Sequence, residues 1–356
     1  MVTKYTPAEN FEQLVLGRPA NWIPFSLDVG AMPGFTNPIM NRFREETGAE
    51  DPAEYFDYDF RTFSLTAKFG GDDARTWHSE IKDGTTFDEW GIGHWAGGTE
   101  GTYERILPPL LNARTVQQIE ALPSPILTQG PDVTPVTEYH RRGYPVFGYA
   151  GSIYEWSWWL RGMDKFMMDL LLQPVFAEAL LQKVKAYTKK LALASGQAGI
   201  DVLCFYDDVG MQSGMQISPD LWRKYVKTAW KEVLDAVRAE TPRAKTFLHS
   251  CGNIREIIPD IIDLGFDVLH PLQPECMDLK QIRRDFSKYI VICATISAQR
   301  TLPFGKPKEV RAEVRRLKST FAPDNRCILC PSNMVQPETP WENILAFVDE
   351  TRAAGA

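Results

Sequence analysis

Lys245-Thr246-Phe247-Leu248-His249-Ser250-Cys251-Gly252 joins an apolar segment to a polar turn, and a helix-like stretch over residues 253–264 follows it. A short apolar run bounded by turn residues is typical of a buried parallel strand. Side chains alternate along a strand, so His249 and Cys251 are predicted to point to the same side at its end. An imidazole and a thiolate that converge there form half of a tetrahedral zinc site, although a core histidine and a buried free cysteine would give the same pattern.

Similar apolar segments recur along the chain and alternate with helix-like segments. Strands are predicted over residues 144–150, 202–206, 245–248, 267–270, 290–294 and 327–330, and helices over 219–240, 253–264, 277–286, 306–321 and 339–353. Ser218-Pro219 and the capping box Thr339-Pro340-Trp341-Glu342 mark two helix starts. This alternation predicts an α/β protein, a (β/α)8 TIM barrel, with an open doubly wound sheet as the alternative.

The first 140 residues are less regular and predict an N-terminal extension and an insertion. Thr6-Pro7-Ala8-Glu9 caps a short helix that ends near residue 16, and residues 22–28 predict the first barrel strand. Residues 73–103 are rich in Gly, Trp and Thr without helical periodicity, which predicts an inserted hairpin or lid. The prolines of residues 123–135 predict a loop back to the barrel. We expect residues 1–356 to form one domain.

Composition excludes several classes of protein. The chain has 356 residues, is 44% hydrophobic and carries a net charge of −7, which argues against nucleic-acid binding. No apolar run reaches the roughly 20 residues that span a bilayer, and no leader segment is visible, so a cytoplasmic location is expected. Six cysteines in such a chain indicate thiols or metal ligands rather than disulfides. An acidic surface is compatible with a protein partner, including a second copy in a homodimer.

The carboxyl ends of the predicted strands carry the polar side chains. Barrel enzymes place their active sites at these ends. We expect Cys204 and Cys293 to be core residues and His270 to be structural. The candidate groups at the strand ends are Asp207-Asp208, His249 with Cys251, residues 270–273, and residues 330–333.

Several motifs occur together in a characteristic order. They are Arg18-Pro19 followed by Trp22-Ile23-Pro24, Trp158-Trp159-Leu160-Arg161-Gly162, Asp207-Asp208-Val209-Gly210, His249-Ser250-Cys251-Gly252, Gln273-Pro274-Glu275 and Pro337-Glu338-Thr339-Pro340-Trp341-Glu342-Asn343. In these motifs the chain resembles the uroporphyrinogen decarboxylase-like superfamily. The resemblance implies a (β/α)8 barrel that is either a decarboxylase or a cobalamin-dependent methyltransferase.

The resemblance is closer to the methyltransferase branch. Decarboxylases carry an arginine-rich stretch after the first strand, whereas this chain has Leu27-Asp28-Val29-Gly30-Ala31 there. A substrate with eight carboxylates needs several cations. His249-x-Cys251 corresponds to the zinc motif of the methyltransferases. Thiol-methylating members add a cysteine on the last strand, at the position of Asn333 here.

The remaining metal ligands stay open at this point. Cys330, three residues before Asn333, is a candidate third ligand, and Glu275 and Cys276 are weaker candidates. Cys327 and Cys330 would point to opposite faces of a regular strand, so one metal ion cannot easily bind both.

The resemblance implies zinc and a corrinoid carried by a partner protein. We expect an O-demethylase that moves a methyl group from a small methoxylated compound, such as an aryl methyl ether, to Co(I). The alternatives are a methylcobamide:thiol methyltransferase and a decarboxylase or non-catalytic barrel. The corrinoid protein is expected to dock over the barrel mouth, and the insertion at residues 73–103 is the expected lid that must move for it. The candidate substrate-binding or catalytic residues are Tyr206, Asp207, Asp208, Gln273, Asn333 and Trp156, the last as part of an aromatic wall with Trp158 and Trp159.

Overall fold

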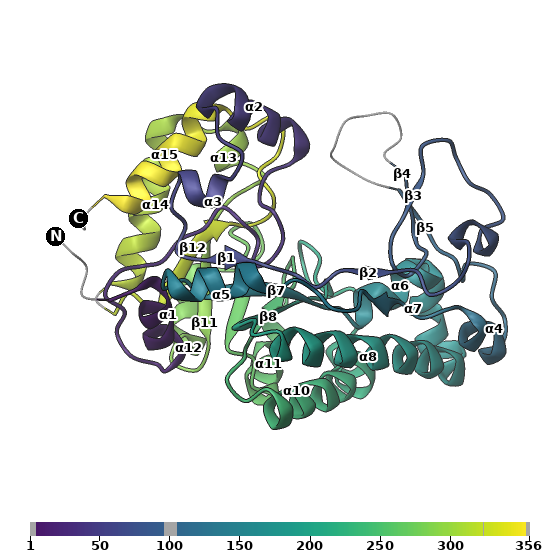
Figure 1. Ribbon diagram of the computed structural model, residues 1–356. Coiled ribbons are helices and arrows are strands. Elements are labelled where there is room, and N and C mark those ends of the chain that lie inside the picture. Colours follow the sequence, from purple (N-terminus) through teal and green to yellow (C-terminus); the bar gives the residue numbers. More distant parts are fainter. Residues whose placement is uncertain (1–4, 96–104, 323, 354–356) are drawn as a thin grey trace.

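The computed structural model describes residues 5–95, 105–322 and 324–353, and its centre is a curled parallel sheet (Figure 1). Seven strands pair in the order β1-β7-β8-β9-β10-β11-β12. The six strands predicted from residue 144 onward are all present. The bounds are β1 Arg61–Thr62, β7 Val146–Gly151, β8 Val202–Tyr206, β9 Lys245–His249, β10 Val268–Leu272, β11 Val291–Ile296 and β12 Cys327–Pro331.

A short segment around Phe25 closes the barrel between the two edge strands. The Ser26 amide donates to the Leu329 carbonyl at 3.1 Å, and on the other side the Asp59 amide donates to the Phe25 carbonyl at 3.1 Å. This segment occupies the eighth strand position of the barrel, in the place predicted for the first strand. It forms only an isolated bridge, Phe25 to Leu329, rather than a strand over residues 22–28. The (β/α)8 barrel is therefore confirmed, with one of its eight strand positions held by only a few backbone hydrogen bonds.

Helices surround the barrel on its outer side (Figure 1). None of the described helices is long and apolar enough to cross a membrane. The bounds are α1 Pro7–Val15, α2 Asn37–Thr47, α3 Pro52–Tyr55, α5 Thr134–Arg141, α6 Tyr154–Arg161, α7 Met163–Leu172, α8 Pro174–Gln197, α9 Pro219–Leu221, α10 Thr228–Glu240, α11 Ile258–Leu264, α12 Leu279–Phe286, α13 Thr301–Phe304, α14 Pro307–Phe321 and α15 Trp341–Arg352.

The predicted helix starts have different outcomes. The Thr6 capping box is confirmed, and Ser218 caps the run that continues through a π-helix, Trp222–Lys227, into α10. The predicted Thr339 capping box is wrong. Pro340 is the N-cap of α15, and no side chain caps the helix. The Thr339 amide donates to the Gln336 carbonyl in the preceding turn. The buried Thr339 hydroxyl has no hydrogen-bond partner among the described residues.

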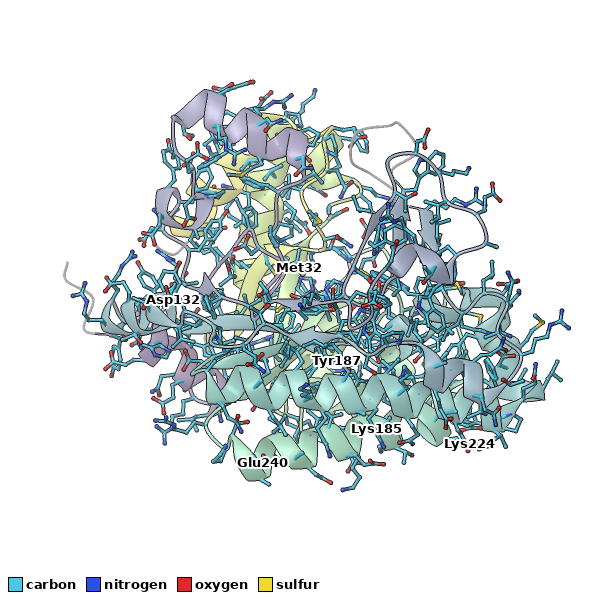
Figure 2. All side chains as sticks on the ribbon, turned by 45° about the vertical axis from the view of Figure 1, so that its right-hand side comes forward. Met32, Asp132, Lys185, Tyr187, Lys224 and Glu240 are labelled. Carbon is cyan, nitrogen blue, oxygen red and sulfur yellow. The ribbon has the colours of Figure 1, made fainter. Side chains whose placement is uncertain are left out.

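The insertion between β1 and β7 contains a small antiparallel sheet. Its elements are a 3-10 helix Ala74–Trp77, β3 Thr86–Phe87, β4 Gly93–Trp95, β5 Arg105–Leu107 and α4 Val116–Ala121. Residues 96–103 of the predicted lid lie outside the described residues. Trp90 is fully buried and packs edge-on against Trp156 and Tyr187. Tyr187, labelled in Figure 2, lies on α8, so this packing holds the described part of the insertion against the helices that follow β7.

The predicted loop at residues 123–135 is more structured than expected. It contains β6, Ile126–Leu127, which pairs with β2, Ala67–Lys68, and its end is the first turn of α5. Two-residue strands carry too little sequence pattern to be predicted.

Two cores lie on the two faces of the barrel sheet. One fills the barrel interior and includes Cys204, Cys293 and Cys330, and α1 closes its amino-terminal end through Phe11. The other lies between the sheet and the helices and includes Cys327. The prediction that Cys327 and Cys330 point to opposite faces is thus confirmed, as is the core role of Cys204 and Cys293.

Candidate metal centre

Three neighbouring strands place aromatic side chains side by side inside the barrel. Tyr206 on β8, His249 on β9 and His270 on β10 are direct register partners. The Tyr206 and His249 rings lie 5.3 Å apart, and those of His249 and His270 lie 4.8 Å apart. His249 is only 6% exposed and His270 is fully buried. The rings of Tyr206, His249 and His270 form the floor of the site, directly below the polar groups that follow the strand ends.

Asp208, His249 and Cys251 converge just above this floor. One donor atom from each lies within 4.8 Å of the others. His249 Nε2 lies 3.4 Å from Cys251 Sγ and 3.5 Å from Asp208 Oδ1, and the Cys251 amide donates to Asp208 Oδ1 at 2.7 Å. Imidazole nitrogen, thiolate sulfur and carboxylate oxygen are the three donor types that bind zinc. Three protein ligands leave one coordination position for a substrate atom.

The electrostatics of this group fit a divalent cation. Burial lowers the pKa of His249 to about 3, so its imidazole is neutral and has a lone pair to donate. Burial, followed by the charges of Asp208 and Glu155, raises the pKa of the Cys251 thiol well above its ordinary value. Burial also raises the pKa of Asp208 to about 6. The raised pKa values mean that the anionic forms of Cys251 and Asp208 are costly without a nearby positive charge. A bound cation would supply that charge and stabilise both anions.

Asp207 and Asp208 separate in role, because adjacent residues face opposite sides of a strand. Asp207 points out of the barrel. Its Oδ1 accepts hydrogen bonds from the Ser152 hydroxyl at 2.9 Å and the Glu155 amide at 2.9 Å, and its Oδ2 accepts one from Trp230 Nε1 at 2.8 Å. Asp207 therefore anchors the start of α6 to α10 and lies outside the three-residue group, and its contact with substrate stays a prediction.

Tyr206 and Gln273 support the site through hydrogen bonds to backbone. The Tyr206 hydroxyl donates to the Val29 carbonyl at 2.5 Å and accepts from the Ala31 amide at 2.8 Å. Gln273 Oε1 accepts from the Gly252 amide at 2.9 Å. Gly252 has a φ of 84°, a conformation that favours glycine, and it forms the turn directly after Cys251. These bonds hold the turns that flank the group.

Trp156 and Asn333 were both predicted to line the substrate site. Trp156 is 3% exposed and packs among Trp90, Tyr149 and Tyr187, so it belongs to the core rather than to an open aromatic wall. Asn333 is exposed at the mouth, and its Nδ2 lies 3.5 Å from Cys251 Sγ. Asn333 therefore contacts the thiol whereas Trp156 only supports the wall behind it.

Residues 94–354 match the family profile described as uroporphyrinogen decarboxylase (URO-D). The chain belongs to the URO-D family. Two curated relatives are the methylcobamide:CoM methyltransferases MtaA of Methanosarcina barkeri and of its strain Fusaro. The first is 27% identical over 157 residues, which are 44% of this chain and 43% of the relative. The second is 25% identical over 194 residues, 54% of this chain and 50% of the relative, so the chain spans about half the length of these relatives.

A solved structure of another protein shares the fold. The methyltransferase from Methanosarcina mazei superposes with a TM-score of 0.67 at 18% identity, and the match covers 98% of both chains. At this level of identity the similarity establishes the architecture only.

The other candidate ligands in this URO-D barrel lie apart from the three-residue group. Cys330 is 3% exposed inside the barrel, next to Cys293 and His270, whose hydrogen bonds offset the effect of burial and lower the pKa of Cys330 to about 6. Cys276 Sγ contacts Gln212 Oε1 at 2.8 Å. Glu275 accepts a hydrogen bond from Ser297, and its other buried oxygen has no partner among the described residues.

Glu155 is a site residue that the sequence interpretation missed. It lies in the first turn of α6, and its Oε2 accepts a weak hydrogen bond from the Asp208 amide at 3.4 Å. Burial, followed by the nearby charges of Asp208 and Asp207, raises its pKa well above the ordinary value. Its position soon after the strand predicted at residues 144–150 was a usable signal, because barrel sites collect at such ends.

Proposed function

We propose that this chain is a zinc-dependent methyltransferase that takes a methyl group from a small methoxylated compound and gives it to the Co(I) of a corrinoid protein. The convergence of His249, Cys251 and Asp208 at the carboxyl end of β8 and β9 is the observation that carries the proposal. Membership of the URO-D family and similarity to methylcobamide:CoM methyltransferases support it.

In this proposal His249, Cys251 and Asp208 hold Zn²⁺. When bound, the ion would act as a Lewis acid toward the ether oxygen. The protein groups around it hold the donor and exclude water. Tyr206 and His270 form the floor, and Glu155 presents a carboxyl group next to Asp208 from which the departing oxygen can take a proton.

We infer the direction of transfer from charge and from the type of ligand. Burial first, and then the charge of Asp208, raises the pKa of the Cys251 thiol. The Asp208 carboxylate would repel an anionic thiol acceptor such as coenzyme M but not a neutral methyl ether. A zinc ion with one thiolate among its protein ligands is also a stronger Lewis acid than a zinc ion with two. Both points favour an oxygen donor.

Thiol methylation is the second candidate. The names of the two matched relatives favour it, because both are methylcobamide:CoM methyltransferases. A decarboxylase is less consistent with this chain, since Asp28 offers an acid just after the first barrel segment, where a polycarboxylate substrate would need cations.

The test combines metal content with turnover. Purified protein should contain about one zinc per chain and convert cob(I)alamin to methylcobalamin with at least one methoxylated aromatic compound, read by absorbance. Cys251→Ala should abolish both, whereas Cys327→Ala, a buried cysteine of the outer core, should keep both. Methylation of coenzyme M or homocysteine from methylcobalamin, without activity on any methoxylated compound, would reverse the assignment.

A further inference from the structure

His270 makes contacts on both ring nitrogens, in the interior of the barrel. Its Nδ1 lies 2.8 Å from His249 Nδ1, and its Nε2 lies 3.2 Å from the Pro331 carbonyl oxygen of β12. The ring also hydrogen-bonds to Cys330, the residue before Pro331 on the same strand. The ring stacks between Phe247, 5.5 Å away, and His249. It therefore connects β9, β10 and β12 directly beneath the candidate metal centre.

The positions of the protons follow from the hydrogen-bonding partners. A carbonyl oxygen only accepts, so His270 Nε2 carries a proton and donates to Pro331. His270 is fully buried, where an imidazolium without a counter-ion would be costly, so the ring is neutral and its Nδ1 has the lone pair. His249 must then carry its proton on Nδ1 and donate it to His270. The lone pair of His249 is thereby on Nε2, the atom that faces Cys251 Sγ at 3.4 Å and Asp208 Oδ1 at 3.5 Å.

We propose that His270 is a positioning residue that holds His249 in the Nδ1–H tautomer and aims its Nε2 lone pair at the space shared with Cys251 and Asp208. Its consequence for zinc binding rests on the proposed function. Metal-ligating histidines usually donate their second nitrogen to a carboxylate, a backbone carbonyl or water. Here a second histidine takes that place and is itself fixed by a backbone carbonyl of the last strand.

A packing role and a positioning role predict different replacements for His270. Phenylalanine keeps the flat ring between Phe247 and His249 but offers no acceptor. Asparagine places its Oδ1 close to the position of the histidine Nδ1 and can still accept the proton of His249. Glutamine reaches toward the position of Nε2 and can keep the bond to Pro331 without contacting His249. Positioning therefore favours asparagine, whereas packing favours phenylalanine.

The tautomer can be read in metal-free protein. Long-range ¹H–¹⁵N correlation spectra of histidine-labelled protein should show His249 as the Nδ1–H tautomer in the wild type and in His270→Asn. The same tautomer should be lost or mixed in His270→Phe and His270→Gln. Circular dichroism and thermal melts establish that each variant is folded.

Zinc affinity, measured by competition with a chelator, gives the second readout. It should fall about 10–100-fold in His270→Phe and His270→Gln, the range for loss of a residue that orients a ligand, and stay within a few-fold in His270→Asn. An Nε2–H tautomer in the wild type, or wild-type zinc affinity in His270→Phe, would overturn the positioning role. If wild-type protein shows the Nδ1–H tautomer but retains no zinc, the proposed function fails while the positioning role is supported.

Discussion

A cysteine lies at the carboxyl end of both β9 and β12, but the two thiols have different surroundings. Cys251 lies two residues beyond the end of β9, where its thiol is within reach of His249 and Asp208. Cys330 lies within β12, inside the barrel and next to Cys293. In a parallel barrel, inward residues within a strand become core, and those just past its carboxyl end become site. Depth along the strand therefore decides which cysteine can serve a metal ion.

Replacing the two cysteines should give the largest contrast. Cys251→Ala should reduce bound zinc from about one ion per chain to almost none, with little loss of stability, because the thiol lies at the rim of the barrel. Cys330→Ala should retain zinc but cost about 1–3 kcal/mol of unfolding free energy, since it leaves a cavity in a packed interior. Elemental analysis and urea unfolding measure the two effects. Zinc loss in Cys330→Ala together with retention in Cys251→Ala would invert the comparison.

The neighbouring aspartates offer a second contrast of the same kind. Asp207→Asn should cost about 2–4 kcal/mol of stability, because an amide nitrogen would face donors in a buried site. Asp208→Asn should leave stability nearly unchanged and weaken zinc binding at least about tenfold. Equal loss of stability in both variants, measured by urea unfolding, would show that Asp208 is structural as well.

Zinc affinity should rise with pH. Burial first, then nearby acids, keeps the Cys251 thiol protonated in the metal-free protein, and binding must release that proton. The affinity should therefore increase about tenfold per pH unit above pH 6. Below that point the slope should steepen, because Asp208, with a pKa of about 6, must also lose its proton. Chelator competition between pH 5 and 8 measures the slope, and a flat profile would exclude Cys251 as a ligand.

The smallest effect is expected at Cys276. Its thiol contacts Gln212 rather than the three-residue group, so Cys276→Ala should change zinc affinity by no more than about twofold. A large loss in that variant, measured by the same competition, would bring the loop after β10 into the ligand set.

Much of the fold could be predicted from the sequence, because the strands after residue 144 are apolar and separated by capped helices. Strand alternation also placed His249 with Cys251. It could not assign Asp207 and Asp208, since both faces of a barrel strand are apolar and the pattern does not say which face is interior. His270 joins the site through contacts between neighbouring strands that are distant in sequence, which no local pattern encodes, whereas the position of Glu155 just after a predicted strand was a signal that could have been used. Trp156 could not be assigned from the sequence, because an aromatic cluster is equally typical of a core and of a binding wall.

Zinc K-edge X-ray absorption of the purified, zinc-loaded protein tests the proposed ligand set most directly. Ligation by His249, Cys251 and Asp208 predicts one sulfur at about 2.3 Å, with nitrogen and oxygen atoms at about 2.0–2.2 Å. The sulfur contribution should disappear in Cys251→Ser, while Cys330→Ser should leave it unchanged. Two sulfurs per zinc, or protein that retains no zinc, would contradict the assignment.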